Sequence, residues 1–244
     1  MMLGEKFKPL GHRAYGSIPH LPGSKRGPGD HGISQEQADL AIKKCKNRHF
    51  RVHVQEKVDG TNVSIAKING EIIPLVRAGY VANTSPFSMH HLFYTWALKQ
   101  DWGWLPDNHR LCGEWILQAH GTRYNLVDGP FVAFDVMYEH TRLCLKDFTS
   151  LVPECFNRVH TFHTGVLSIS DAMAALNDAK GRFGFHYALE PVEGAIWRVE
   201  EYNTVEKCWN LNFICKYVRP DSITGKYLPE ISGEEVWNFS CVGS

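Results

Sequence analysis

The sequence predicts an α/β (α+β) protein with mixed, mainly antiparallel sheets flanked by helices. Three observations predict it: an alternating strand at 50–57, a strand pair joined by Asn69-Gly70, and helical segments interspersed among further strands. Strands that are joined by tight turns pair antiparallel. The chain shows no internal repeat and no linker, so one domain over residues 1–244 is the simplest organisation.

The N-terminal region is expected to be a loop-rich arm followed by a helix. Residues 1–33 are rich in Gly, Pro, His and basic residues, which favours irregular but ordered structure. A helix is expected from Ser34 to about Lys46, because Ser34 and Gln37 have the spacing of a capping box. Its inward-facing residues are predicted to be Ala38, Ala41, Ile42 and Cys45.

The segment 50–57 has the period-two pattern of a half-buried strand. Its apolar face consists of Phe50, Val52 and Val54. Its other face consists of Arg51, His53, Gln55 and Lys57. Lys57 therefore ends the strand on the polar face, shortly before a glycine.

A hairpin over 63–68 and 71–77 follows, since Asn69-Gly70 supplies the left-handed dihedrals of a two-residue turn. Further helices are expected near 89–100 and 170–179. Further strands are expected near 110–116, 131–137, 195–199 and 211–218.

The charge balance argues against a protein that coats nucleic acid nonspecifically, because 26 basic and 26 acidic residues give no net charge. A local basic groove is compatible with this balance. One dense basic cluster, either a solvated helix end or part of such a groove, consists of Lys43, Lys44, Lys46, Arg48 and Arg51. The chain has no apolar run approaching about 20 residues and no signal-peptide pattern, so we expect a cytoplasmic protein without a membrane partner.

Cysteine and histidine patterns do not predict a metal centre. The 7 cysteines are odd in number, irregularly spaced and without a Cys-x-x-Cys pair, so reduced thiols are expected. The 13 histidines show no zinc-ligand spacing, so no dedicated zinc site is expected. A His-rich metal-binding protein is a rival function that rests on composition alone.

Lys57 is a candidate nucleophile, because an amine held at a strand end beside carboxylates can be placed rigidly and have its pKa tuned. A surface Lys-Asp pair beside a turn is the alternative for a lone match. The segment 56–62, Glu-Lys-Val-Asp-Gly-Thr-Asn, resembles motif I of the covalent nucleotidyltransferases. These include ATP-dependent DNA ligases, RNA ligases and mRNA capping enzymes. The continuation Thr61-Asn62 is most similar to the RNA ligases.

Further segments resemble the other motifs of this superfamily in the same order. Arg77, before Ala-Gly-Tyr, resembles motif Ia, whose arginine lies near the nucleotide and the nucleic acid end. Glu114 in Gly-Glu-Trp resembles motif III, whose glutamate binds the ribose. The segment 131–136 resembles motif IIIa, which implies that Phe134 stacks on the purine, whereas Phe131 is expected in the core.

Glu193 in Glu-Gly-Ala-Ile resembles motif IV, whose carboxylate helps to position the divalent metal. Lys216 resembles the motif V lysine that binds the triphosphate. Many ligases have a second lysine two residues earlier, but position 214 is Ile. Arg219 or Lys207 could supply the second charge.

The resemblance covers most of the chain and implies a nucleotidyltransferase (ATP-grasp-like ligase) domain that acts as an ATP-dependent RNA ligase. Lys57 would attack the α-phosphorus of ATP, with Mg²⁺ or Mn²⁺, to give lysyl-AMP and pyrophosphate. AMP would pass to an RNA 5′-phosphate, and a 3′-hydroxyl would displace it. The resemblance implies that Glu56 helps to read the adenine. Asp59 belongs to the site without a specific role, and Asn62 is a candidate for RNA or phosphate contact.

The alternatives within the superfamily are a DNA ligase and a capping-type guanylyltransferase. Both normally carry an oligonucleotide-binding barrel after motif V, and only 25 residues follow Arg219, so no such barrel is expected. A non-catalytic nucleotide- or RNA-binding relative is the alternative from another class. Nicked duplex, single-stranded and tRNA substrates all stay open, and the N-terminal arm or a partner protein could supply specificity.

Overall fold

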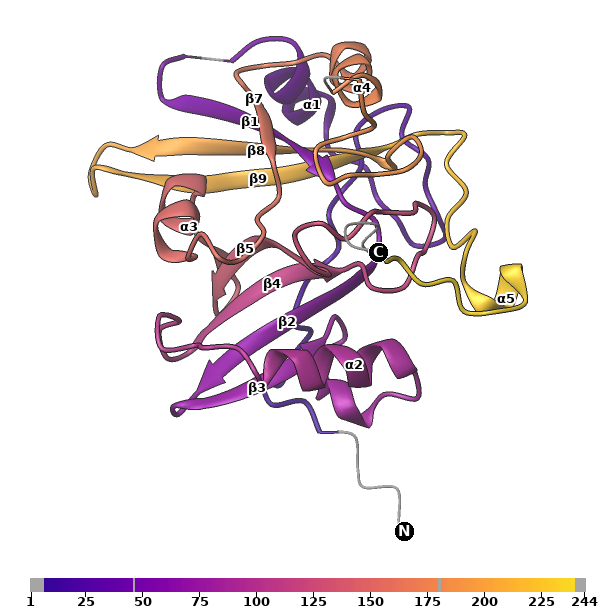
Figure 1. Cartoon of the computed structure of the whole chain (residues 1–244). Helices are drawn as coiled ribbons and strands as arrows, with labels where there is room; N and C mark the ends of the chain where they lie inside the picture. The colour runs from indigo at the N-terminus through magenta and orange to yellow at the C-terminus, as the bar shows by residue number, and fades with distance from the viewer. Residues whose placement is uncertain (1–6, 46, 180, 240–244) are drawn as a thin grey trace. The chain divides into compact units, whose positions relative to one another are not determined.

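Two antiparallel sheets form the framework of this computed structural model, which describes residues 7–45, 47–179 and 181–239 (Figure 1). One sheet has the strand order β7-β1-β8-β9 and the other β3-β2-β4-β5-β6. Every pairing between these strands is antiparallel. The predicted fold class, a mixed α/β protein with mainly antiparallel sheets and flanking helices, is confirmed.

The chain divides into two compact units, each built on one sheet. Unit 1 consists of residues 1–16, 61–115 and 131–157, and unit 2 consists of residues 17–60, 116–130 and 158–244. The chain therefore passes five times from one unit to the other. The prediction of a single domain over 1–244 stays a prediction.

Unit 2 carries the sheet that begins with the predicted Lys57 strand. Its strands are β1 (Phe50–Lys57), β7 (Thr161–Thr164), β8 (Gly194–Asn203) and β9 (Cys208–Val218). Its helices are α1 (Gln35–Ile42), α4 (Ile169–Asn177) and the short α5 (Pro229–Ser232). Both α1 and α4 contact β8, and they lie above this sheet in Figure 1.

Strand β1 has the bounds and the face pattern that the sequence predicts. Val52 and Val54 are fully buried. Val54 lies opposite Trp197 of β8, whose indole Nε1 donates a hydrogen bond to the Leu167 carbonyl just before α4. This apolar face therefore packs toward α4, and the alternation leaves Lys57 on the other face.

Helix α1 begins as predicted and ends early. Ser34 is its N-cap, and the reciprocal bonds of the capping box with Gln37 are present. The helix ends at Ile42, four residues before Lys46, which lies outside the described residues. Ala38 and Ala41 are buried as predicted, and so is Leu40, whereas Ile42 and Cys45 are only half-buried.

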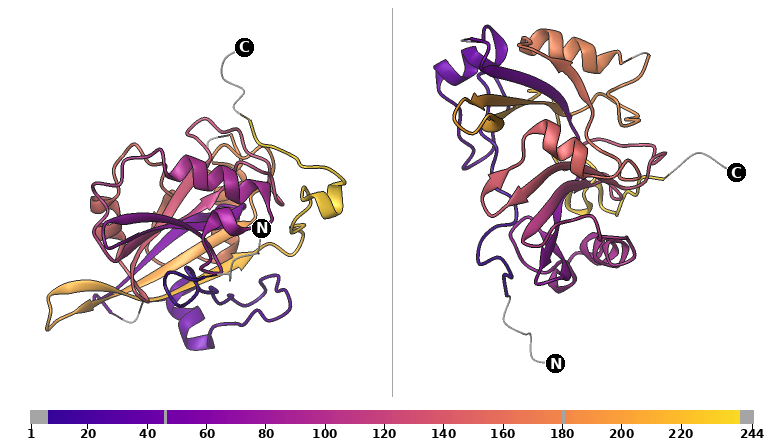
Figure 2. Two further views of the ribbon diagram at one scale, coloured as in Figure 1. Left: turned by 90° about the horizontal axis from the view of Figure 1, so that it is seen from below. Right: turned by 90° about the vertical axis from the view of Figure 1, so that its left-hand side faces the viewer.

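The N-terminal arm is irregular, as predicted, over its described residues 7–33 (Figure 2). Its part in unit 2 follows the edge of β9 and hydrogen-bonds to it. Leu21 donates its N–H to the Lys216 carbonyl at 2.8 Å, and Lys25 donates to the Val218 carbonyl at 2.9 Å. The arm thus covers part of an edge that would otherwise present unpaired backbone groups.

Unit 1 contains the predicted hairpin. Its strands are β2 (Thr61–Ile68), β3 (Glu71–Val76), β4 (His109–Trp115), β5 (Phe131–Tyr138) and the short β6 (Thr141–Arg142). Its helices are η1 (Ala82–Thr84), α2 (Ser88–Ala97) and α3 (Leu145–Leu151). Asn69 and Gly70 have φ values of 51° and 79°, so they form the left-handed turn that joins β2 to β3.

An aromatic core lies between α2 and the unit 1 sheet. The ring centroid of Trp96 lies 5.4 Å from that of Trp115 and 5.0 Å from that of Phe131. Phe131 is 3% exposed, which confirms its predicted place in the core. The sequence missed α3, β6 and β7: α3 has no side-chain N-cap, and both strands are short.

Neither a membrane span nor a disulfide is found in the described part of the chain. No described helix is long and apolar enough to cross a membrane. Six described cysteines are free, and Cys241 lies outside the described residues. Over the same residues, no group of three His, Cys, Asp or Glu side chains is placed to hold a metal ion.

Candidate active site

Lys57 and Glu193 meet where β1 ends and β8 begins. Lys57 pairs in register with Gly194, the first residue of β8, so the preceding Glu193 lies beside it. The Lys57 ammonium forms an ion pair with the Glu193 carboxylate, and both side chains are mostly buried. A Cβ at Gly194 would lie 1.8 Å from the Tyr217 carbonyl oxygen, so only glycine allows β9 to approach here. The predicted nucleophile and the predicted metal ligand are thus in direct contact.

Asp59 anchors the turn that follows Lys57. Its carboxylate accepts a hydrogen bond from the Gly121 N–H at 2.6 Å, and its own N–H donates to the Tyr124 hydroxyl at 3.0 Å. Burial, and then the negative charge of Glu193, raise the pKa of the Asp59 carboxyl to about 7. Asp59 therefore ties the turn to the loop 120–124 and adds a second carboxylate beside Glu193.

His120 is a site residue that the sequence analysis missed. Its carbonyl accepts the Tyr227 N–H at 2.7 Å. Burial lowers the pKa of its imidazole to about 4, while the charges of Glu193 and Lys57 act on it in opposite directions. His120 is therefore neutral at pH 7 and close to the ion pair. The sequence signal was the adjacent Gly121, where a Cβ would collide with Asp59, because glycine marks a close approach.

Lys216 lies on the same sheet face as Lys57. It pairs with Ile196, two residues after Gly194, and residues two apart on a strand share a face. Two strand spacings separate β1 from β9, which is about 10 Å. On the side of β9 away from β8, His20 of the arm forms a parallel β-bridge with Lys216. The motif V lysine is thus held between β8 and the arm.

Asp30 of the arm contributes a negative charge near Lys216. A hydrogen bond from Gly27 and then, among the charges, Lys216 lower the pKa of Asp30. The His20 ring contacts Asp30 at 3.1 Å and the Ser24 hydroxyl at 2.7 Å. This part of the arm therefore surrounds the motif V lysine with polar groups that the sequence motifs did not include.

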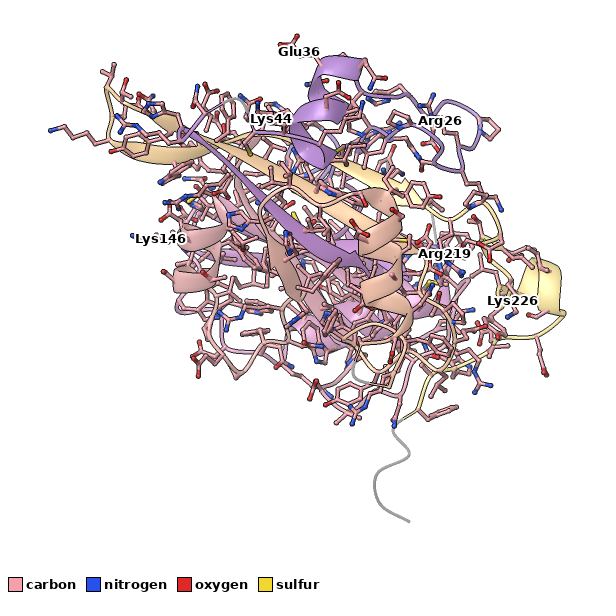
Figure 3. All side chains as sticks on the ribbon, turned by 90° about the horizontal axis from the view of Figure 1, so that it is seen from above. Arg26, Glu36, Lys44, Lys146, Arg219 and Lys226 are labelled. Atoms are coloured by element: carbon pink, nitrogen blue, oxygen red, sulfur yellow. The ribbon has the colours of Figure 1, made fainter. Side chains whose placement is uncertain are left out.

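Arg219 holds the segment that leads into β8. Its guanidinium donates to the carbonyls of Val192 at 2.8 Å and Pro191 at 3.2 Å (Figure 3 labels Arg219). It also pairs with Asp221 at 3.1 Å. The backbone N–H of Arg219 donates to the Glu193 carbonyl at 3.0 Å. The guanidinium, which we considered as a second motif V charge, is thus engaged with the protein beside Glu193.

Neither Lys207 nor position 214 adds a second positive charge beside Lys216. Lys207 lies in the turn between β8 and β9, beyond Asn203. Nine residues separate Asn203 from Gly194, a distance of about 30 Å along a strand. Ile214 shares the face of Lys216 but is 7% exposed. The structure does not bring Lys207 to Lys57.

Glu56 lies on the opposite face of β1 from Lys57. It is 1% exposed, and its carboxylate accepts the Phe185 N–H at 2.5 Å. Burial raises the pKa of this carboxyl to about 7. A Cβ at Gly184 would lie 2.6 Å from the Glu56 carboxylate, so the chain passes close over it. Glu56 is therefore a buried acid and is not beside the Lys57 ammonium.

Three predicted site residues come together at one end of the unit 1 sheet. Asn62 pairs in register with Glu114, and its carbonyl accepts the Arg77 N–H at 3.2 Å. The buried Asn62 Oδ1 accepts no hydrogen bond from any residue that the structure describes. An orphaned buried acceptor is costly unless a ligand satisfies it. This group is thus a candidate for binding a hydroxyl or amine of a ligand.

Phe134 occupies a bulge in β5. Ala133 lies opposite Gly113 and Asp135 lies opposite Cys112, which leaves Phe134 as the extra residue. Bulges re-aim side chains and are frequent next to active sites. The Phe134 ring lies 5.0 Å from that of Tyr15, whose hydroxyl donates to the buried Asp135. Asp135 therefore lies in the buried interior of unit 1, whereas the neighbouring Phe134 is half-buried.

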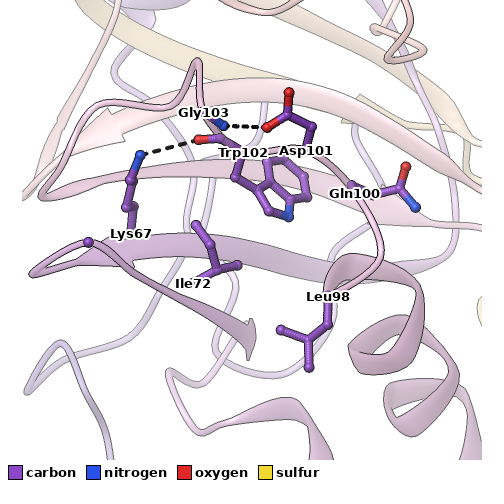
Figure 4. A pocket seen from close by; sticks show the side chains of 8 residues that line it. Lys67, Ile72, Leu98, Gln100, Asp101, Trp102 and Gly103 are labelled. Atoms are coloured by element: carbon purple, nitrogen blue, oxygen red, sulfur yellow. Dashed lines mark hydrogen bonds between the residues drawn. The ribbon is translucent and has the colours of Figure 1, made fainter.

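A groove of about 280 Å³ in unit 1 contains none of these residues (Figure 4). Lys67 donates to the Trp102 carbonyl at 3.3 Å there. The groove is lined by Lys67, Gly70, Ile72, Leu98, Gln100, Asp101, Trp102 and Gly103.

Residues 50–218 match the family model for RNA ligase. This match covers more than half of the chain, so the chain belongs to the RNA ligase family. No curated protein matches the chain.

Several solved structures are distantly similar. An archaeal ATP-dependent RNA ligase is 21% identical with a TM-score of 0.41, over 69% of this chain and 42% of that chain. An apo mutant of a Naegleria gruberi RNA ligase is 14% identical with a TM-score of 0.49, over 88% and 60%. Another mutant of the Naegleria enzyme, with AMP and Mn, is 12% identical with a TM-score of 0.43, over 82% and 59%. This chain spans about half of the length of these proteins.

Proposed function

We propose that the chain is an ATP-dependent RNA ligase that transfers AMP through Lys57. The observation that carries the proposal is the ion pair of Lys57 with Glu193 at the β1–β8 junction. A lysine held by a register-fixed strand pair and a buried carboxylate has the rigid placement that a nucleophilic amine needs. Membership of the RNA ligase family supports the same function.

In the first step, the Lys57 amine attacks the α-phosphorus of ATP. The ammonium first loses a proton to solvent, and positive charge bound beside Lys57 would favour the neutral amine. A nitrogen–phosphorus bond forms and the bond to pyrophosphate breaks. Lys216, on the same sheet face, would stabilise the departing negative charge.

In the later steps, a 5′-phosphate oxygen of RNA attacks the phosphorus bonded to Lys57, which restores the amine and gives an RNA capped with AMP. A 3′-hydroxyl oxygen then attacks the RNA phosphate, and AMP leaves. In unit 1, the Glu114 and Asn62 acceptors would bind ribose or terminal hydroxyls, Arg77 would bind phosphate, and Phe134 would stack on the base.

The donor set fits a divalent cation. Glu193 and Asp59 supply carboxylate oxygens, and Mg²⁺ is usually bound through one or two carboxylates together with substrate phosphates. Mg²⁺ or Mn²⁺ held there would neutralise charge on the transferring phosphate. Since Glu193 also contacts Lys57, the same carboxylate would place both the amine and the cation.

The experiment is the intact mass of the protein after incubation with ATP and Mg²⁺. We expect a gain of one AMP in the wild type and no gain in Lys57→Ala. Lys226→Ala is a matched control, because Lys226 is also ion-paired in unit 2, with Glu190 at 2.7 Å, and should gain AMP normally. An adduct at the wild-type level in Lys57→Ala would overturn the assignment of the nucleophile.

The same experiment separates the alternatives. No adduct in wild-type protein that is free of pre-bound AMP would favour a non-catalytic nucleotide- or RNA-binding relative. Competition of GTP with labelled ATP would reveal a guanylyltransferase. Sealing of nicked DNA in preference to RNA would reveal a DNA ligase.

A further inference from the structure

The end of the unit 2 sheet opposite to Lys57 carries a group of stacked basic and aromatic side chains. The Arg51 guanidinium lies 3.7 Å from the ring centroid of Trp209. The rings of Trp209 and Tyr202 are 5.3 Å apart, and those of Tyr202 and His49 are 6.2 Å apart and stacked. Together with the neighbouring Arg48 and Lys207, these four residues are called the distal surface below.

Three segments build the distal surface. Arg51 comes from the start of β1, and Tyr202 pairs with Trp209 at the closed end of the β8–β9 hairpin. The Tyr202 N–H donates to the His49 carbonyl at 2.8 Å, which joins the loop before β1 to the hairpin. The rings are therefore held by backbone pairing and not by side-chain contact alone.

The distal surface is accessible and basic. Arg48, Arg51 and Lys207 are exposed, while Tyr202 and Trp209 are half-buried. Lys44, two residues after the end of α1, is also exposed (Figure 3 labels Lys44). Three glutamates lie nearby. Glu200, opposite Arg51, is buried and contacts the His53 ring at 3.5 Å. Glu206 accepts a hydrogen bond from Asn203 at 2.9 Å, and Glu201 accepts one from Asn212 at 2.5 Å.

This combination is the one that unpaired nucleic acid requires. Bases of a single strand stack on aromatic rings and guanidinium planes, and cations contact the phosphates. A paired duplex hides its base faces, so rings of this kind give it little. The sequence alone left two interpretations of the basic cluster, a solvated helix end or part of a basic groove. In the folded protein, the β8–β9 hairpin adds aromatic side chains to this cluster.

We propose that the distal surface binds a single-stranded segment of the RNA substrate, away from the ends that are joined; this rests on the proposed function. Arg51 lies six residues from Lys57 on β1, which is about 20 Å. A stacked strand advances about 3.4 Å per nucleotide, so the contacted bases lie about six nucleotides from the reacting end. The distal surface would thereby select substrates with an unpaired flank.

The test is the affinity for 5′-phosphorylated single-stranded RNA of about four, about eight and about twelve nucleotides, followed by fluorescence anisotropy. We expect wild-type affinity to rise once the RNA exceeds about six nucleotides. Trp209→Ala should lose about tenfold in affinity for the longer RNAs and nothing for the shortest, because one stacked base is removed. Trp209→Phe should restore most of the loss.

Two controls keep the test specific. Lys146→Glu reverses an exposed charge on α3 of unit 1 and should change affinity equally at every length or not at all. Formation of the AMP adduct needs no RNA, so normal adduct formation in Trp209→Ala shows that its fold is intact.

The two proposals fail in different ways. If the wild type forms no AMP adduct but the length dependence is lost in Trp209→Ala, the proposed function is wrong and RNA binding at the distal surface stands. If the adduct forms and Trp209→Ala binds every length as the wild type does, the distal surface is not an RNA site. A preference for duplex RNA that is insensitive to Trp209→Ala would overturn it as well.

Discussion

Two carboxylates, the buried Glu56 and the half-buried Asp59, flank Lys57 in the sequence and have different roles. Asp59 shares the surroundings of Glu193 and is bonded to the loop 120–124, so its charge acts on the reaction centre. Glu56 lies on the other face of β1 under Gly184. Both have a pKa raised to about 7, chiefly by burial. Two acids of one motif thus differ in role because Glu56 lies within β1, on the face opposite to Lys57, whereas Asp59 lies in the turn after the strand.

Glu56 should make the stability of the protein depend on pH. Below its unfolded pKa of 4.5, this carboxyl is protonated in both the folded and the unfolded protein, so its burial costs no ionisation energy. Above that pH the unfolded protein ionises more readily, so the stability of the fold is lost as pH rises through about 7. The shift corresponds to about 3 kcal/mol at most. We expect Glu56→Gln, which keeps the shape, to be more stable than the wild type at pH 8 and less pH-dependent between pH 5 and 8, measured by urea unfolding. A pH profile unchanged by Glu56→Gln would show that Glu56 is ionised at little cost.

At the scale of elements, the site is positioned by segments outside the helices and strands. The segment 191–193 is held by Arg219, and the β9 edge at Lys216 is held by the arm. Neither residues 191–193 nor the arm belong to a helix or strand, so the position of each depends on individual hydrogen bonds. Single substitutions there should act on the site at a distance.

Arg219 should act as a positioning residue for Glu193. Arg219→Lys keeps the charge but lacks the rigid planar fork that bonds both carbonyls, so we expect AMP-adduct formation to slow by about tenfold in both Arg219→Lys and Arg219→Ala. The Mg²⁺ concentration that gives half the maximal rate should rise, which a general loss of stability would not cause. If Arg219→Lys reacts normally and only Arg219→Ala is slow, the charge of Arg219 matters and the positioning role is wrong.

Ser24 should stabilise the arm. Its hydroxyl oxygen accepts the Val218 N–H at 2.9 Å and contacts the buried His20 ring at 2.7 Å. Ser24→Ala leaves both groups without this partner, at a cost of about 1–3 kcal/mol. We expect a lower urea midpoint for Ser24→Ala and near-normal stability for Ser24→Thr. Equal stability of Ser24→Ala and the wild type would mean that water satisfies both groups.

Across the whole molecule, the sequence predicted what is encoded locally. The alternation of 50–57, the Asn69-Gly70 turn and the capping box at Ser34 each depend on a few neighbouring residues, and each is present in the structure. The pairing of the arm with β9 joins residues almost 200 positions apart, which no local pattern encodes.

The site followed the same division. The motifs located Lys57 and Glu193, and the structure brings them into contact. Sequence spacing could not show that Arg219 bonds to the protein or that Lys207 lies at the far end of a hairpin. Both facts depend on strand length, because the extension of β8 to Asn203 sets the position of the turn.

The interleaved chain should make the two units unfold together, which would support the prediction of one domain. Cys112 and Cys144 are buried in unit 1 and Cys215 is buried in unit 2, while Cys155 is exposed. Burial raises the pKa of Cys112 to about 11 and also raises that of Cys215, so their thiols react only after unfolding. In a urea series with a thiol-labelling reagent, Cys155 should react at once, and the three buried cysteines should become reactive at one shared midpoint. If Cys215 reacts at a lower urea concentration than Cys112 and Cys144, unit 2 unfolds alone, and five crossings of the chain do not suffice to make one cooperative domain.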